Sequence, residues 1–142
     1  MKQVKSHIEE LRARKYPCAQ ATLLGIARGT GASMPDEKTL MAITAGLRGG
    51  IGRTYNEGTC GALTGATVAL GLLFPDDEEK AIALSNELFK GFSQEFGTVI
   101  CGKITNEYCL KRCTECCIKA GCLAACLYQR ETMCYNNNIP ND

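Results

Sequence analysis

Apolar residues recur at helical spacing along almost the whole chain. Val4, Ile8 and Leu11 form an i, i+4, i+7 stripe inside a charged segment, which is the pattern of an amphipathic helix. That helix should end near Lys15. By the same reasoning, with Pro and acidic residues as start signals and Gly as stop signals, further helices are predicted over residues 17–29, 35–47, 60–74, 76–96 and 106–133.

The fourth predicted helix is preceded by a glycine-rich loop over residues 49–58. Thr59 is a suitable N-cap, so Cys60 is expected to be the first residue inside this helix. Gly61, Gly65 and Gly71 alternate with small residues along it, so other backbones could approach closely. We therefore expect the helix to lie either at the centre of the fold or at the face of a homodimer.

No segment has the alternation of β-branched residues, or the Asn-Gly or Asp-Gly turns, that are typical of strands and hairpins. The chain of 142 residues has the usual size of one domain. The sequence thus predicts an all-α fold, a single compact helical bundle of five or six helices. The helical domain should cover residues 1–134 and a polar tail residues 135–142.

Charge and composition disfavour several functions. The formal net charge is +1, and the nine aromatic residues include no Trp, so nothing favours nucleic acid or an anionic membrane surface. Residues 1–15 are charged throughout and resemble no secretory signal. The longest nearly apolar stretch, residues 62–74, is too short to span a bilayer. We expect a cytoplasmic protein without a membrane span.

Cysteine is the unusual component. The chain has ten, and eight of them lie between Cys101 and Cys134. In a reducing compartment such clusters are more often metal ligands or redox thiols than disulfides. Cys18, Cys60 and Cys101 each fall at or near a predicted helix start, where free N–H groups and the helix dipole favour the thiolate.

The segments around these cysteines also resemble those of a known protein family. Thr59-Cys60-Gly61-Ala62-Leu63-Thr64-Gly65-Ala66, preceded by Gly49-Gly50-Ile51-Gly52-Arg53, resembles the signature of the C_GCAxxG_C_C family, whose members are described as redox-active. The segments around Cys18 (residues 16–21) and Cys101 (residues 96–101) are similar to the family's first and third cysteine segments. The likeness covers roughly residues 16–121.

The resemblance implies a small helical protein with a site of four thiols. Its fourth cysteine matches Cys113 best. The neighbouring Cys109, Cys116 and Cys117 could bind a second metal or extend the first site, or they could be packing residues or solvent thiols. A related segment beside haem domains in split-Soret-type cytochromes looks like an iron–sulfur site. On a helix, Cys109, Cys113, Cys116 and Cys117 share one stripe, whereas Cys122 and Cys126 face the opposite side.

Three functions follow as hypotheses. In the first, Cys18, Cys60, Cys101 and Cys113 hold an iron–sulfur cluster for electron transfer to a redox partner protein. In the second, the thiols work without metal as an oxidoreductase or sulfur carrier, with Cys60 attacking and a neighbour such as Cys18 resolving. In the third, zinc is a structural staple of a binding protein.

Two further motifs give weaker indications of function. Residues 97–103 approach a phosphate-binding loop, but Ile104 stands where Ser or Thr must hold magnesium. The glycine-rich loop, with Arg48 and Arg53 nearby, could bind an anion, but it more simply positions Cys60. His7 is the only histidine, and its charged helix favours a surface position over a ligand role.

Overall fold

The computed structural model describes residues 2–105 and 110–137. Within these ranges the chain forms seven α-helices and one short 3₁₀ helix, with no strand. They are, in chain order, α1 (Lys2–Ala13), α2 (Cys18–Thr30), α3 (Glu37–Thr44), η1 (Ala45–Leu47), α4 (Gly61–Leu73), α5 (Glu78–Phe96), α6 (Cys101–Thr105) and α7 (Leu110–Asn137). The predicted all-α class is confirmed, with slightly more helices than expected.

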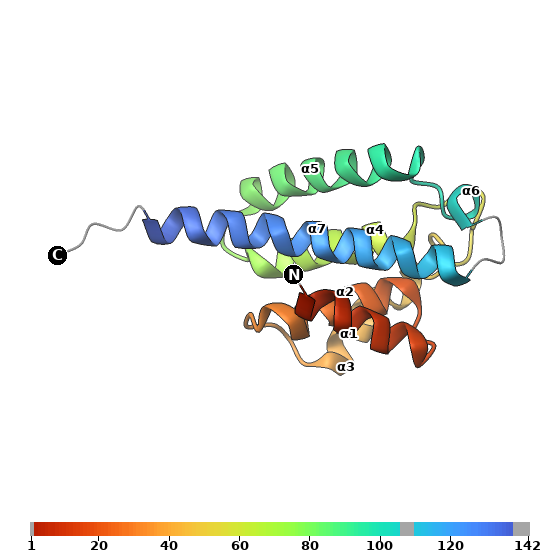
Figure 1. Cartoon of the computed structure of the whole chain (residues 1–142), viewed down its shortest axis with the longest axis horizontal. Helices are drawn as coiled ribbons and strands as arrows, with labels where there is room; N and C mark the ends of the chain where they lie inside the picture. Colours follow the sequence, from red (N-terminus) through yellow and green to blue (C-terminus); the bar gives the residue numbers. More distant parts are fainter. Residues whose placement is uncertain (1, 106–109, 138–142) are drawn as a thin grey trace.

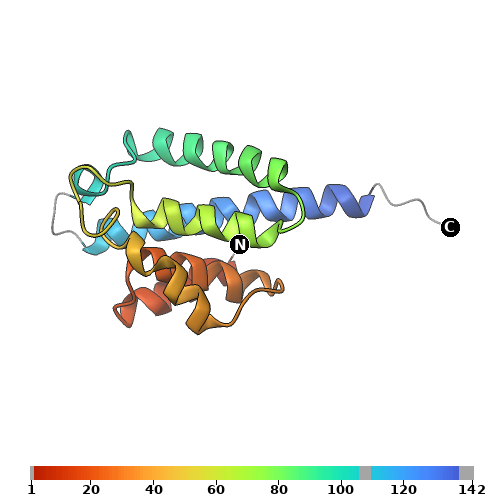
Figure 2. The same ribbon diagram turned by 180° about the vertical axis from the view of Figure 1, so that it is seen from behind.

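The helices pack in layers around α4 and α7 (Figures 1 and 2). Helix α5 covers one side of this central pair, and α1 and α2 cover the other, with α3 outermost. The core is built mainly from the apolar faces of α1, α2, α4, α5 and α7. The expectation that the small-residue helix α4 lies centrally is therefore confirmed.

The helix ends follow from local chemistry. Asp36 and Asp77 are N-caps whose carboxylates accept hydrogen bonds from the N–H groups of Thr39 (2.8 Å) and Lys80 (3.1 Å). Gly31 and Gly97 end α2 and α5 in the left-handed conformation that glycine adopts without steric cost.

Several predicted boundaries need correction. Cys60 is the N-cap of α4 and not its first residue, because its backbone pairs with residue 99. The predicted helix 35–47 divides into α3 and η1, and the five-residue α6 forms an element of its own. Helix α7 begins at Leu110 and continues to Asn137, three residues into the predicted tail; the predicted start at 106–109 lies outside the described residues.

One end of the bundle gathers segments that are far apart in the sequence. The starts of α2, α4 and α7, the whole of α6 and the glycine-rich loop before α4 all lie there (right in Figure 1, left in Figure 2). This end carries the candidate site.

Candidate functional site

A short antiparallel bridge between Thr59 and Ile100 brings Cys60 beside Cys101. The Cys60 N–H donates to the Val99 carbonyl (2.7 Å), and the Cys101 N–H donates to the Gly58 carbonyl (2.9 Å). Each cysteine directly follows a bridged residue, and side chains alternate in extended backbone, so the two thiols face the same side. They are close enough for the charge of Cys60 to act on Cys101.

Cys18 joins them because α2 and α4 approach very closely. A Cβ atom at Gly61 would lie 2.5 Å from the Cys18 sulfur and 2.8 Å from the Leu47 carbonyl oxygen. A Cβ at Gly65 would lie 2.6 Å from the Ala19 carbonyl oxygen. Only glycine at these two positions allows the start of α2, and with it Cys18, to rest against α4.

Helix α7 supplies three more thiols, Cys113, Cys116 and Cys117, of which the last two are fully buried. The Cys18 thiol hydrogen-bonds with Cys113, which in turn hydrogen-bonds with Cys117. The Cys117 thiol donates to the Cys18 carbonyl at 3.6 Å. Cys116 hydrogen-bonds with Cys60. We refer to these residues as the six-thiol site: Cys18, Cys60, Cys101, Cys113, Cys116 and Cys117.

Most of these sulfurs resist ionisation. The hydrogen bond to Cys113 and burial raise the pKa of Cys18 far above its usual range. Burial, together with the nearby Cys60 and Cys18, raises the pKa of Cys101 to about 11. Hydrogen bonding to Cys117 raises that of Cys113 to about 12, and hydrogen bonding to Cys60 strongly raises that of Cys116. Closely packed thiols cannot all be thiolates unless a cation offsets their charge.

Cys60 is the exception, with a pKa lowered to about 7. The largest cause is the hydrogen bond from Cys116, and the N–H groups of Ala62 and Leu63 in the first turn of α4 add to it, against the opposing effect of burial. Cys60 makes no conventional side-chain cap, yet it lies where the positive end of the helix dipole favours a thiolate.

Arg12 of α1 is a charged residue beside the site that sequence reasoning missed. The charge of its guanidinium adds to the lowering of the Cys60 pKa, after the larger effects of Cys116 and the α4 N–H groups, and it opposes part of the rise in the pKa of Cys113. It is held by hydrogen bonds to the Tyr16 carbonyl (2.7 Å) and the Thr114 hydroxyl (3.3 Å), the latter next to Cys113 on α7. No sequence signal separates Arg12 from the other basic residues of α1, because the contact arises only when α1 packs on α7.

The other chemistry-bearing residues have separate places. Cys122 lies near Lys5 and Glu9 of α1, with burial raising its pKa, and Cys126 is exposed. This agrees with the expected opposite side of α7. His7 is half-buried on α1. The candidate Cys109 lies outside the described residues.

The donor set suits a soft metal or an iron–sulfur cluster, because it consists of thiols. The sulfurs are nevertheless arranged in hydrogen-bonded pairs. Within residues 2–105 and 110–137, no three or more His, Cys, Asp or Glu side chains are grouped so as to hold a metal ion. The structure thus shows thiols gathered in one place, and a metal would have to replace their hydrogen bonds.

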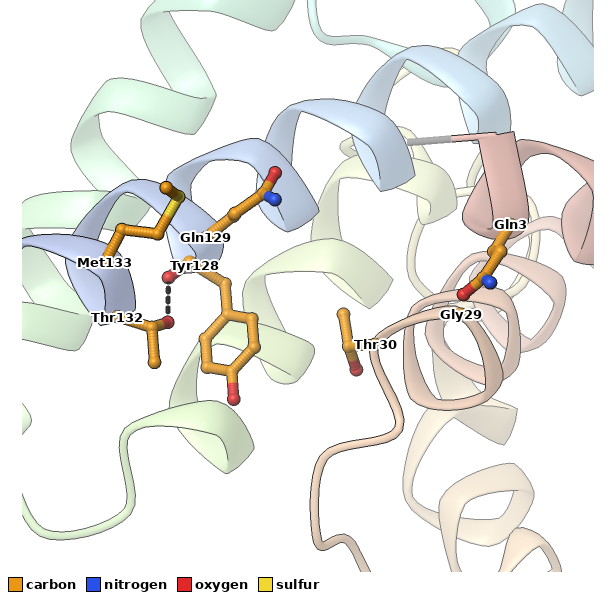
Figure 3. Close-up of a pocket in the computed structure, with 7 residues that line it drawn as sticks. All are labelled: Gln3, Gly29, Thr30, Tyr128, Gln129, Thr132 and Met133. Atoms are coloured by element: carbon orange, nitrogen blue, oxygen red, sulfur yellow. Dashed lines mark hydrogen bonds between the residues drawn. The ribbon is translucent and has the colours of Figure 1, made fainter. Parts of the chain in front are cut away.

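The structure has one cavity beside the site and another far from it. One of about 310 Å³ borders Pro17, directly before Cys18. Another, of about 420 Å³, lies at the opposite end of the bundle, where Gln3, Gly29 and the Tyr128 and Thr132 side chains meet (Figure 3). It contains no cysteine and no charged residue, so it is not part of the thiol chemistry.

One protein family matches most of the chain. No helix in the described part of the chain has the length and apolar character needed to cross a membrane. No curated protein and no solved structure matches the chain at a significant level. The model of the family described as "Putative redox-active protein (C_GCAxxG_C_C)" matches residues 16–127, a range that contains all of the six-thiol site. The chain belongs to this family.

Proposed function

We propose that this chain is an electron-transfer protein whose six-thiol site holds an iron–sulfur cluster, with Cys18, Cys60, Cys101 and Cys113 as ligands. The observation that carries the proposal is the burial of thiols from four separate parts of the chain at one place. When bound, such a cluster supplies one-electron transfer.

Burial favours this function over exchange with a protein disulfide. Cys18 and Cys101 are 6 % exposed and Cys60 is 1 % exposed. An attacking thiolate must reach the sulfur of its substrate directly, whereas an electron can pass through a thin protein layer to a redox partner protein.

The mutual repulsion of the site thiolates also favours a bound cluster. The pKa values of Cys18, Cys101, Cys113 and Cys116 are raised in part by their thiol neighbours, so each site thiolate makes the next one harder to form. Bound iron would offset this repulsion and replace the thiol protons. Arg12 would offset part of the charge that remains.

A second candidate function rests on the pair Cys60 and Cys116. A thiolate with a pKa of about 7 that accepts a hydrogen bond from a neighbouring thiol is suited to form an internal disulfide. From this thiolate–thiol pair, formation of the S–S bond releases one proton, that of Cys116, and passes two electrons to an oxidised redox partner protein. It needs no access for a substrate sulfur.

Anaerobic purification of the full chain, followed by iron, zinc and acid-labile sulfide analysis and visible absorption spectroscopy, separates these functions. We expect iron with sulfide and a visible absorption band. Stoichiometric colourless zinc would instead indicate a structural staple, and the absence of both metals would leave the dithiol function.

Single serine variants then test the ligands. Cys60→Ser should reduce iron content at least tenfold, since it removes the thiolate best prepared to bind, while the matched variant Cys126→Ser should retain it. Cys113→Ser and Cys116→Ser compared side by side identify the ligand on α7. A Cys60→Ser protein with full iron and sulfide content would contradict the assignment.

A further inference from the structure

The cavity beside Cys18 has a charge pattern that the redox chemistry does not explain. Its volume is about 310 Å³, and it lies between the start of α2, the η1 region and the glycine-rich loop. Its charged lining residues, Arg48 and Arg53, are both basic. The complete lining is Pro17, Gln20, Thr44, Ala45, Arg48, Gly52 and Arg53.

Neither guanidinium has an ion-pair partner among residues 2–105 and 110–137. Elsewhere Arg28 pairs with Glu37 through two hydrogen bonds of 2.6 and 2.9 Å, and Arg130 pairs with Glu87. In the part of the chain that the structure describes, the side chains of Arg48 and Arg53 have no such partner. Both side chains are exposed, so solvent screens their mutual repulsion, and an anion in the cavity would be attracted by both charges.

The backbone at Arg53 adds an independent observation. Its φ of 59° is left-handed, which among described non-glycine residues occurs otherwise only at Lys15. A side chain in this conformation is strained, and glycine would avoid the strain. The neighbouring Gly52 has nearly the same φ, 58°. The chain thus keeps a guanidinium where glycine would be relaxed, and that side chain lines the cavity.

We propose that this cavity binds a small molecule through an oxyanion group, a phosphate or a carboxylate, held by Arg48 and Arg53. The planar fork of arginine matches both groups through paired hydrogen bonds. The occupant would lie next to the sulfurs, because Pro17 precedes Cys18 and the N–H of Gly49, beside Arg48, hydrogen-bonds with the Cys18 sulfur. The proposal holds whether the six-thiol site carries iron or works as a dithiol.

The test is an NMR titration of the reduced full chain with sodium phosphate and, separately, with sodium succinate, both at constant ionic strength. Backbone amide signals of residues 48–53 should shift saturably with at least one probe. The double variant Arg48→Gln/Arg53→Asn should bind that probe at least tenfold more weakly, because asparagine tolerates a positive φ but carries no charge. Lys90→Gln, which removes an exposed charge elsewhere, should bind like the unaltered chain.

The probe that saturates identifies the oxyanion group. Absence of saturable shifts with both probes in the unaltered chain would overturn the proposal, and so would equal affinity in the double variant. Iron content is measured on the same samples. The double variant should keep it unchanged, so loss of oxyanion binding and loss of the redox site are read separately.

Discussion

At the scale of single residues, Cys60 differs from its neighbours because several stabilising groups meet at its sulfur. The hydrogen bond from Cys116, the first turn of α4 and the charge of Arg12 all favour the thiolate there. The sequence predicted the helix-start effect for Cys18, Cys60 and Cys101 alike. Only at Cys60 does it outweigh burial and thiol neighbours, and those depend on packing that one sequence does not reveal.

The role of Arg12 gives a prediction about pH. Arg12→Gln should raise the pKa of Cys60 from about 7 by roughly half a unit, the effect of removing one nearby charge at intermediate dielectric constant. The ultraviolet absorbance of the thiolate, measured against pH in the metal-free protein and corrected with Cys60→Ser, follows this change. Arg14→Gln is the control, and an unchanged Cys60 titration in Arg12→Gln would contradict the role.

The lowered pKa of Cys60 also predicts how the stability of the fold depends on pH. The pKa of Cys60 in the folded chain is below its ordinary value of 9.0, so its thiolate stabilises the fold above pH 9. This contribution is lost as the pH falls from 9 through 7. The raised pKa values of Cys101 and Cys113 act only at higher pH, where they destabilise the fold as the pH rises.

At the scale of elements, the crossing of α2 and α4 sets the position of Cys18. The sequence predicted both helices within a few residues and indicated close approach through the glycines of α4. It did not predict α6, because five residues are too few for a helical pattern. That helix is positioned by non-local contacts, such as the 2.6 Å hydrogen bond from the Gly102 N–H to the Tyr55 carbonyl.

Replacing a glycine of α4 with alanine should have opposite effects on stability, depending on the position. Gly61→Ala and Gly65→Ala should each lower the free energy of unfolding by about 1 to 3 kcal/mol, because the new methyl group meets the Cys18 sulfur or the Ala19 backbone. Gly71→Ala should raise it by about 0.5 to 1 kcal/mol, since nothing lies within 4 Å and alanine favours the helix. Urea unfolding measures all three. Equal effects at the three positions would argue against the close crossing.

At the scale of the whole molecule, the site lies where α2, α4 and α7, which also pack on one another in the core, meet the short helix α6. Recognition of the family signature suggested a shared site for Cys18, Cys60, Cys101 and Cys113, and the structure gathers these thiols. It also places Cys116 and Cys117 among them. The sequence left this open because helical spacing shows which thiols of α7 share a face, but not which part of the bundle that face meets.

This arrangement predicts that metal loading stabilises the entire bundle. A group bound by thiols of α2, α7, α6 and the N-cap of α4 ties these segments together, and binding to the folded state alone adds stability. Anaerobic reconstitution with iron and sulfide should raise the melting temperature by about 5 °C or more. Cys60→Ser should show no such rise, and a loaded protein that melts with the metal-free one would contradict a ligand set spread over the bundle.

The span from Cys18 to Cys117 also constrains when the site can be made. During synthesis on the ribosome, α1 and α2 emerge long before the first turns of α7, so Cys18 and Cys60 lack the thiols of α7 for most of the synthesis of residues 1–117. Any ion or disulfide that depends on α7 must therefore be acquired after the first turns of α7 have left the exit tunnel. The centre cannot be complete while only the helices before α7 have been made.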